Sequence, residues 1–180
     1  MTSHLTILPV LVPLTTAIML MLWPARNYAG RRAISLAGAV ALLMVVLALL
    51  EEVLESGSQP YYLGDWPAPF GIVLLADRAS ALLLLTTAVL ALAALLFSLR
   101  GEDGRGRRYH ALFHFQLMGI NGAFLAADLF NLFVFFEVLL IASYSLLMHG
   151  TGKARTRAAL HYVILNLTGS RLFLIALGMI

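Results

Sequence analysis

Apolar residues gather in six long runs that are separated by short polar connections. The runs cover residues 5–23, 33–50, 70–99, 110–127, 129–148 and 158–180. A helix rises about 1.5 Å per residue, so about 20 apolar residues span the ~30 Å hydrocarbon core of a bilayer. Residues 33–50 have no polar face, which an outer helix of a soluble bundle would need. The pattern predicts an all-α, polytopic transmembrane protein with six helices.

Composition supports a membrane protein and argues against an enzyme. The chain is 61% hydrophobic and 12% charged, whereas soluble domains are about 45–50% apolar and about 25% charged. Without cysteine it offers no thiolate ligand for zinc or an iron–sulfur cluster. It also lacks a nucleotide-binding loop, metal-ligand spacing and a nucleophile triad. We therefore expect no cofactor, no metal site and no chemistry on a substrate.

Basic residues occupy alternate connections, 24–32, 100–109 and 149–157. Ten of the twelve Lys and Arg lie there: Arg26, Arg31, Arg32, Arg100, Arg105, Arg107, Arg108, Lys153, Arg155 and Arg157. The connection 51–69 carries only acidic charges, and the turn after the fourth run carries only Asp128. The positive-inside rule assigns the basic connections to the cytoplasm and the N-terminus to the outside. The pI near 9.6 therefore indicates membrane topology and no nucleic-acid partner.

Glu137 is the most informative residue, because it lies in the middle of the fifth apolar run. It falls about 12 Å along a helix that begins at Leu129, near the bilayer midplane. An ionised carboxylate there costs about 3 kcal/mol on insertion scales, and such residues usually mark ion or proton pathways. We therefore predict that Glu137 takes up and releases protons. The alternative is a neutral carboxyl that only hydrogen-bonds to a neighbouring helix.

Further polar residues lie within the apolar runs, and each has two interpretations. His110, His114 and Asn121 share one helical face, which could lead protons towards Glu137 or could hydrogen-bond to neighbouring helices. The second interpretation is slightly favoured.

Four other residues complete the accessory set. Tyr144 follows Glu137 by seven residues on the same face and suits a hydrogen-bonded chain or an interfacial belt. His161 favours helix packing over a pathway, and so do Asn166 and Ser170, which form a pair on the sixth run. Asp128 precedes the fifth helix, where a cap is the preferred role.

The segment 121–147, NGAFLAADLFNLFVFFEVLLIASYSLL, resembles the D subunit of the Mrp-type multisubunit sodium/proton antiporters. Residues 66–77, WPAPFGIVLLAD, and 161–178, HYVILNLTGSRLFLIALG, agree in the same order. The resemblance implies a fold of about fourteen helices that contains two inverted repeats. It implies that residues 1–109 are three leading helices and that 110–180 begin the proton-translocating domain. The sixth run is still apolar at Ile180, so we expect the chain to be the N-terminal part of a larger protein.

The resemblance also implies a function. Glu137 matches the essential glutamate of the family's fifth helix, whose lysine partner belongs to a later, broken helix. The expected protein belongs to a hetero-oligomeric complex in the bacterial inner (plasma) membrane that exchanges protons, with sodium as the implied cation.

Two alternatives remain. The chain could belong to a proton-pumping subunit of complex I or of a membrane-bound hydrogenase, whose redox chemistry lies in other subunits. It could also be a truncated segment that does not transport ions by itself.

Overall fold

The computed structural model describes residues 4–24, 27–66, 71–150 and 152–179. Parts of the predicted connections and spans, namely Arg26, residues 67–70 and Ile180, lie outside the described residues, as does the side chain of Lys153.

Six α-helices in the described residues confirm the predicted fold class. They are α1 (Leu8–Leu22), α2 (Tyr28–Ser56), α3 (Arg78–Ser98), α4 (Tyr109–Leu125), α5 (Leu129–Leu147) and α6 (Lys153–Leu177). Five helices of the described chain are long and apolar enough to cross a membrane, when the 3₁₀ turn His4–Ile7 is counted with α1. The exception, α4, has 17 residues, the lower end of the range of about 17–25 for a spanning helix. The chain is a multi-pass membrane protein.

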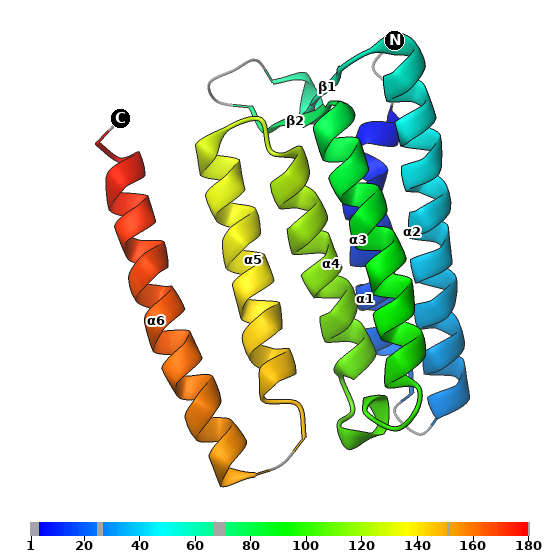
Figure 1. The fold of residues 1–180 in the computed structure, drawn as a ribbon, viewed down its shortest axis with the longest axis vertical. Coiled ribbons are helices and arrows are strands. Elements are labelled where there is room, and N and C mark those ends of the chain that lie inside the picture. Colours follow the sequence, from blue (N-terminus) through cyan, green and yellow to red (C-terminus); the bar gives the residue numbers. More distant parts are fainter. Residues whose placement is uncertain (1–3, 25–26, 67–70, 151, 180) are drawn as a thin grey trace.

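Consecutive helices run in opposite directions, so the three basic connections meet at one end of the molecule (Figure 1). The connection between α2 and α3 and the turn between α4 and α5 lie at the other end. This alternation is the arrangement that the charge pattern requires.

Two helices are longer than their apolar runs. The second run was predicted to end at residue 50, but α2 continues to Ser56 and takes in Glu51, Glu52 and Glu55, which were assigned to the connection. It ends at Gly57, whose φ of 79° suits a residue without a side chain. The sixth run was predicted to begin at residue 158, but α6 begins at Lys153. An apolar run marks the part of a helix that lies in the bilayer. The helix itself can continue into water until a capping residue such as Gly57 ends it.

The third span also begins later than predicted, at Arg78 instead of residue 70. Strand β2 (Val73–Ala76) forms an antiparallel hairpin with β1 (Gln59–Tyr62), in which Pro60 faces Leu75. Asp77 then caps α3, because its carboxylate accepts from Ser80 N–H while the Ser80 hydroxyl accepts from Asp77 N–H. This capping box gives Asp77 a structural role at the start of α3.

The hairpin is tied to the start of α5. Leu74 pairs with Ala126 in an isolated bridge, and Ala127 N–H donates to Val73 C=O at 3.1 Å. The turn between α4 and α5 is therefore held by backbone hydrogen bonds to a segment that precedes α3.

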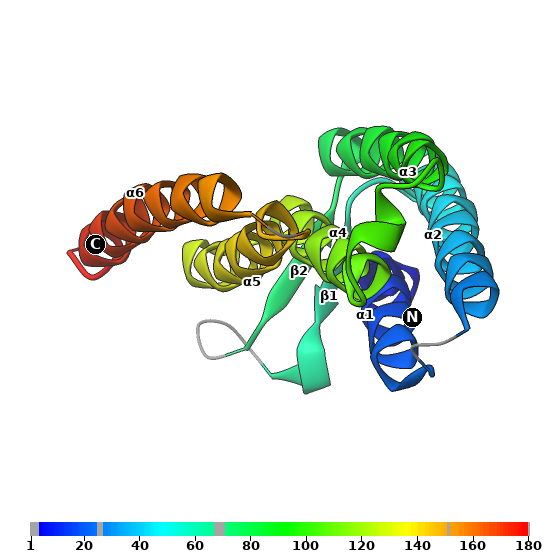
Figure 2. The same ribbon diagram turned by 90° about the horizontal axis from the view of Figure 1, so that it is seen from below.

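The hydrophobic core lies among α1–α4, and α5 and α6 extend from it in a row (Figure 2). Fully buried residues follow helical spacing on α2 and α3, namely Leu42, Val46, Leu49, Val53, Leu84, Ala88 and Leu95. On α6 only Ala159 is fully buried among the side chains that the structure describes.

Helix α5 joins this core through a close approach to α4. A Cβ atom on Gly119 would lie 2.7 Å from the backbone nitrogen of Leu139, nearer than real Cβ contacts allow. The missing side chain at Gly119 therefore lets the two backbones pack tightly, which fixes the position of Glu137 two residues before Leu139.

Candidate functional site

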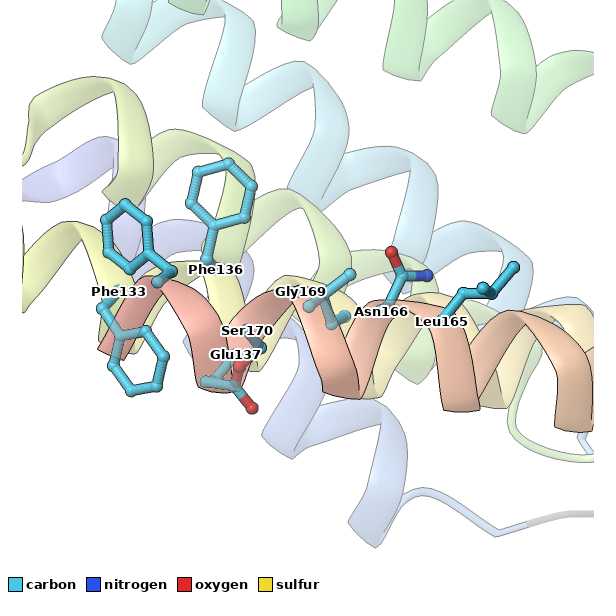
Figure 3. Close-up of a pocket in the computed structure, with 9 residues that line it drawn as sticks. Phe133, Phe136, Glu137, Leu165, Asn166, Gly169 and Ser170 are labelled. Carbon is cyan, nitrogen blue, oxygen red and sulfur yellow. The ribbon is translucent and has the colours of Figure 1, made fainter. Parts of the chain in front are cut away.

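Glu137 lies on the face of α5 that packs against α6, where Ser170 Oγ donates a hydrogen bond to its Oε1 (Figure 3). The glutamate is half-buried. The Phe133 and Phe173 rings stack beside this pair with centroids 6.1 Å apart. The only intramembrane acid of α5 therefore has a hydroxyl partner on the next helix and aromatic cover on one side.

A cavity of about 260 Å³ opens beside Glu137, between α5 and α6. Its walls are apolar except for one carboxyl, one hydroxyl and one amide; they comprise Phe133, Phe136, Glu137, Leu140, Leu165, Asn166, Gly169, Ser170 and Phe173. These lining residues include no Lys, Arg or His. Glu137 is thus the only carboxyl among the lining residues, and the rest of its surroundings in the cavity are mostly apolar.

Tyr144 lies in the same α5–α6 interface as Glu137, on the predicted shared face. Its ring meets the Tyr162 ring of α6 edge-on, with centroids 5.5 Å apart. The Tyr162 hydroxyl in turn lies 3.5 Å from Ser143 Oγ. Tyr144 therefore extends the contact between the two helices beyond Glu137.

Of the two accessory residues predicted on α6, Asn166 reaches the cavity and His161 does not. Asn166 lines the cavity while its Nδ2 donates to Tyr162 C=O at 3.0 Å. The exposed His161 bonds to its own helix, with Nδ1 at 2.9 Å from Arg157 C=O. Ser170, the direct partner of Glu137, was interpreted from sequence only as a packing residue. Its spacing of four from Asn166 was the available signal.

Asp128 caps α5, as predicted. Its Oδ1 accepts from Asn131 N–H at 2.8 Å, and its Oδ2 accepts from the Asn131 side-chain amide. The carboxylate thus satisfies backbone groups at the helix start, where the helix dipole also favours negative charge.

The histidines of α4 face α2 and the basic connections. His114 is fully buried, and its Nε2 lies 3.1 Å from both Ser35 Oγ and Ser35 C=O on α2. His110 Nε2 lies 3.3 Å from Asp103 Oδ2. The contact of His114 is the kind of interhelical hydrogen bond that the favoured interpretation expects, and His110 bonds to the connection before its helix.

An ion pair that sequence reasoning missed joins α2 to the α3–α4 connection. Arg32 donates to both carboxylate oxygens of Asp103, at 2.6 and 2.8 Å, and the Asp103 side chain is 1% exposed. The Arg32 guanidinium holds the pKa of Asp103 below its ordinary value of 3.8, although burial opposes this. The two residues are 71 positions apart, so no local pattern could reveal the pair.

Asn121 satisfies a carbonyl that a proline leaves free. Pro13 lies inside α1 and has no N–H to donate to the carbonyl of Pro9, four residues earlier. The Asn121 side chain, fully buried on α4, donates to that oxygen at 2.8 Å. In a bilayer no water can replace this bond, so the Asn121–Pro9 contact permits the proline.

We expect Asn121→Leu to lower the free energy of unfolding by about 1–3 kcal/mol, because the Pro9 carbonyl loses its donor. In a Pro13→Ala background the backbone N–H of residue 13 is restored, so the same change should cost under about 1 kcal/mol. Thermal unfolding of the purified protein in detergent, followed by circular dichroism, measures both costs. Equal costs in the two backgrounds would contradict this explanation.

Comparison with known proteins finds that the chain is similar to antiporter subunits. Residues 126–180 match the family model described as NADH:quinone oxidoreductase/Mrp antiporter, TM. Over 99% of its length the chain is 47% identical to a probable K⁺/H⁺ antiporter D subunit of Rhizobium meliloti strain 1021, and covers 34% of that protein. It is 42% identical to the Na⁺/H⁺ antiporter D subunit of Bacillus subtilis strain 168, over 98% of this chain and 36% of that protein.

Solved structures agree. A chain of the Mrp complex from Dietzia sp. DQ12-45-1b matches with a TM-score of 0.86 and 29% identity, over 96% of this chain and 34% of that chain. A chain of the archaeal membrane-bound sulfane sulfur reductase matches with a TM-score of 0.89 and 26% identity, over 96% of this chain and 36% of that chain. The chain spans about a third of the length of these proteins, and its residues 126–180 are similar to the NADH:quinone oxidoreductase/Mrp antiporter family of membrane proteins.

Proposed function

We propose that this chain is part of the D subunit of a multisubunit monovalent cation/proton antiporter and that Glu137 binds the translocated proton. One observation carries the proposal: Glu137 is an acid in a spanning helix, at the wall of a cavity that contains no basic lining residue. An unpaired carboxylate in such a setting is costly, so the group gains from binding a proton.

Ser170 suits this role in both protonation states. Its hydroxyl donates to Glu137 when the carboxyl is ionised, and it can rotate to accept a hydrogen bond when the carboxyl carries the proton. The partner on α6 therefore does not need to move away when the charge changes.

The relatives indicate which ions and partners to test. The B. subtilis protein is named a Na⁺/H⁺ antiporter subunit and the R. meliloti protein a probable K⁺/H⁺ antiporter subunit. We infer exchange of protons for sodium or potassium in a complex with other antiporter subunits, in the bacterial plasma membrane. This chain would act without a cofactor and would not be an enzyme.

Everted membrane vesicles test this function directly. The full-length protein is expressed with the subunits encoded beside its gene in a host that lacks its own antiporters. Respiration first acidifies the vesicles, and added NaCl or KCl should then release the protons, which a pH-sensitive dye reports. Absence of release with either cation in a fully assembled complex would refute the proposal.

The second candidate is a proton-pumping subunit of a redox complex. Its support is the shared family model, which also covers NADH:quinone oxidoreductase, and the similarity to a chain of an archaeal respiratory complex. Neighbouring genes discriminate the two, since an antiporter is accompanied by small antiporter subunits and a redox complex by iron–sulfur and quinone-binding subunits. In the redox case proton movement would require an electron donor and would ignore added sodium or potassium.

The division of labour along the chain is also a proposal. Residues 1–109 would form three leading helices, and residues 110–180 would begin the proton-translocating domain. Transport would then require the parts of the relatives that this chain does not span, and the 180 residues alone would not exchange ions.

We propose that the end formed by the basic connections faces the cytoplasm and that the N-terminus lies outside. The chain has no cysteine, so single cysteines can report the orientation. In intact cells, an impermeant maleimide should label Ser58→Cys, beside the hairpin, and should not label Gly104→Cys until the membrane is opened. A Cβ at Gly104 meets nothing within 4 Å, so the substitution should be tolerated. Labelling of Gly104→Cys in intact cells would reverse the topology.

A further inference from the structure

A second cavity lies at the end of the molecule where the basic connections meet. It measures about 100 Å³, and its lining residues are Leu20, Met21, Trp23, Arg31, Arg107 and Arg108. Leu20 and Met21 lie at the end of α1, and Trp23 follows directly after it. Arg31 belongs to the first turn of α2, and Arg107 and Arg108 directly precede α4. Three arginines therefore line one small space, whose lining residues include no acid.

Arg31 is the unusual member of this group, because it is a buried charge. Its relative exposure is 4%, and within the described residues it forms neither an ion pair nor a side-chain hydrogen bond. Its guanidinium carbon lies over the Tyr28 ring, 5.9 Å from the ring centroid. Burying a guanidinium group without a counter-charge is costly, so a binding partner of opposite charge is expected.

The neighbouring carboxylates are already engaged. Asp103 is bound by Arg32 through two hydrogen bonds and also lies against His110. Glu102 pairs with Arg105 at 2.9 Å. The protein thus neutralises Arg32 and Arg105 with its own acids and leaves Arg31, Arg107 and Arg108 without one among the residues that the structure describes.

We propose that this cavity binds the phosphate group of an anionic phospholipid. Arginine forks match phosphate geometry, and basic pockets at the ends of membrane helices favour anionic headgroups. The Trp23 indole, 39% exposed, lines the cavity and can donate its N–H. Beside it, Met21 and Leu22 are 52% and 82% exposed, so they offer an apolar surface for the acyl chains. This apolar surface favours a lipid over free phosphate or an acidic protein segment.

The test titrates the full-length protein in detergent with dioleoylphosphatidylglycerol and, separately, with dioleoylphosphatidylcholine, and counts bound lipid by native mass spectrometry. The two lipids share acyl chains and differ in net charge. We expect Arg107→Gln combined with Arg108→Gln to weaken phosphatidylglycerol binding by about 25-fold, about fivefold for each arginine, and to leave phosphatidylcholine binding unchanged. Both residues are exposed, so the double variant should fold. Arg31→Gln should act in the same direction, and Arg100→Gln, an exposed arginine at the same end, is the matched control.

Any one of the following results would overturn the proposal. The first is phosphatidylglycerol binding by the double variant that equals that of the wild type, or a loss in Arg100→Gln as large as that in the double variant. The second is displacement of the lipid by millimolar inorganic phosphate, which would assign the cavity to the free ion. The third is lipid bound to the isolated protein but absent from the assembled complex, which would assign the cavity to an acidic segment of another protein in the complex.

Discussion

In the assembled complex, Glu137→Gln should reduce cation-driven proton release by a factor of about 100 or more, the range associated with loss of an acid–base group. Glutamine keeps the size of the side chain and still accepts the hydrogen bond from Ser170, but it cannot bind and release a proton. Assembly of the complex should therefore be unchanged. The measurement is dye-reported proton release from everted vesicles, normalised to the amount of complex.

Matched variants separate a proton relay from a packing role. Glu137→Asp keeps the acid on a shorter stem and should retain part of the activity with a shifted pH optimum. Asp128→Asn changes another acid at the start of the same helix but preserves its cap on Asn131, so transport should continue. Full transport by an assembled Glu137→Gln complex would leave Glu137 as a residue that only joins α5 to α6.

The second large effect concerns stability. Asp103→Asn should lower the free energy of unfolding by about 2–3 kcal/mol, because it removes a buried carboxylate that accepts from Arg32 and His110. This expected loss of free energy is smaller than the full cost of breaking a buried ion pair, because the Arg32 side chain is 41% exposed. The adjacent Glu102→Gln is the control. Its pair with Arg105 is exposed on both sides and should contribute less than about 1 kcal/mol.

The difference between wild type and Asp103→Asn should also depend on pH. Folding lowers the pKa of Asp103 below 3.8, chiefly through the hydrogen bond from Arg32. Its stabilising contribution is therefore complete above the unfolded-state pKa and is lost as pH falls through the lower, folded-state value. Thermal midpoints should differ at pH 7 and converge below about pH 3.8. A constant gap down to about pH 3 would show that the carboxylate charge is not the cause.

The helices could be predicted from sequence because lipid imposes a strong local rule: about 20 apolar residues per crossing. The ends of the helices could not be predicted by that rule. Helix α2 stops at Gly57 and α3 starts at the Asp77–Ser80 capping box, and these signals depend on backbone conformation and hydrogen bonding instead of hydropathy. The hairpin was missed because Val73–Ala76 is as apolar as the helix that follows it.

The site was predictable only in part. Glu137 stands out because a carboxyl in an apolar run has few ordinary explanations. Ser170 does not stand out, since serine is common in membrane helices as a packing residue. Sequence also does not show which neighbouring helix a polar face will contact, because tertiary packing decides between α1, α2 and α6. His114 therefore reaches Ser35 and Asn121 reaches Pro9, contacts that a single helix cannot specify.

The contact between Asn121 and Pro9 bridges 112 residues of the chain, and it has an evolutionary consequence. A proline at position 13 is tolerable only while position 121 supplies an amide donor. The two positions should then be inherited together, so that homologous chains with a helix-forming residue at 13 are free to carry an apolar residue at 121. An intermediate that keeps the proline and loses the amide would be selected against, which makes substitution at 13 the permissive first step.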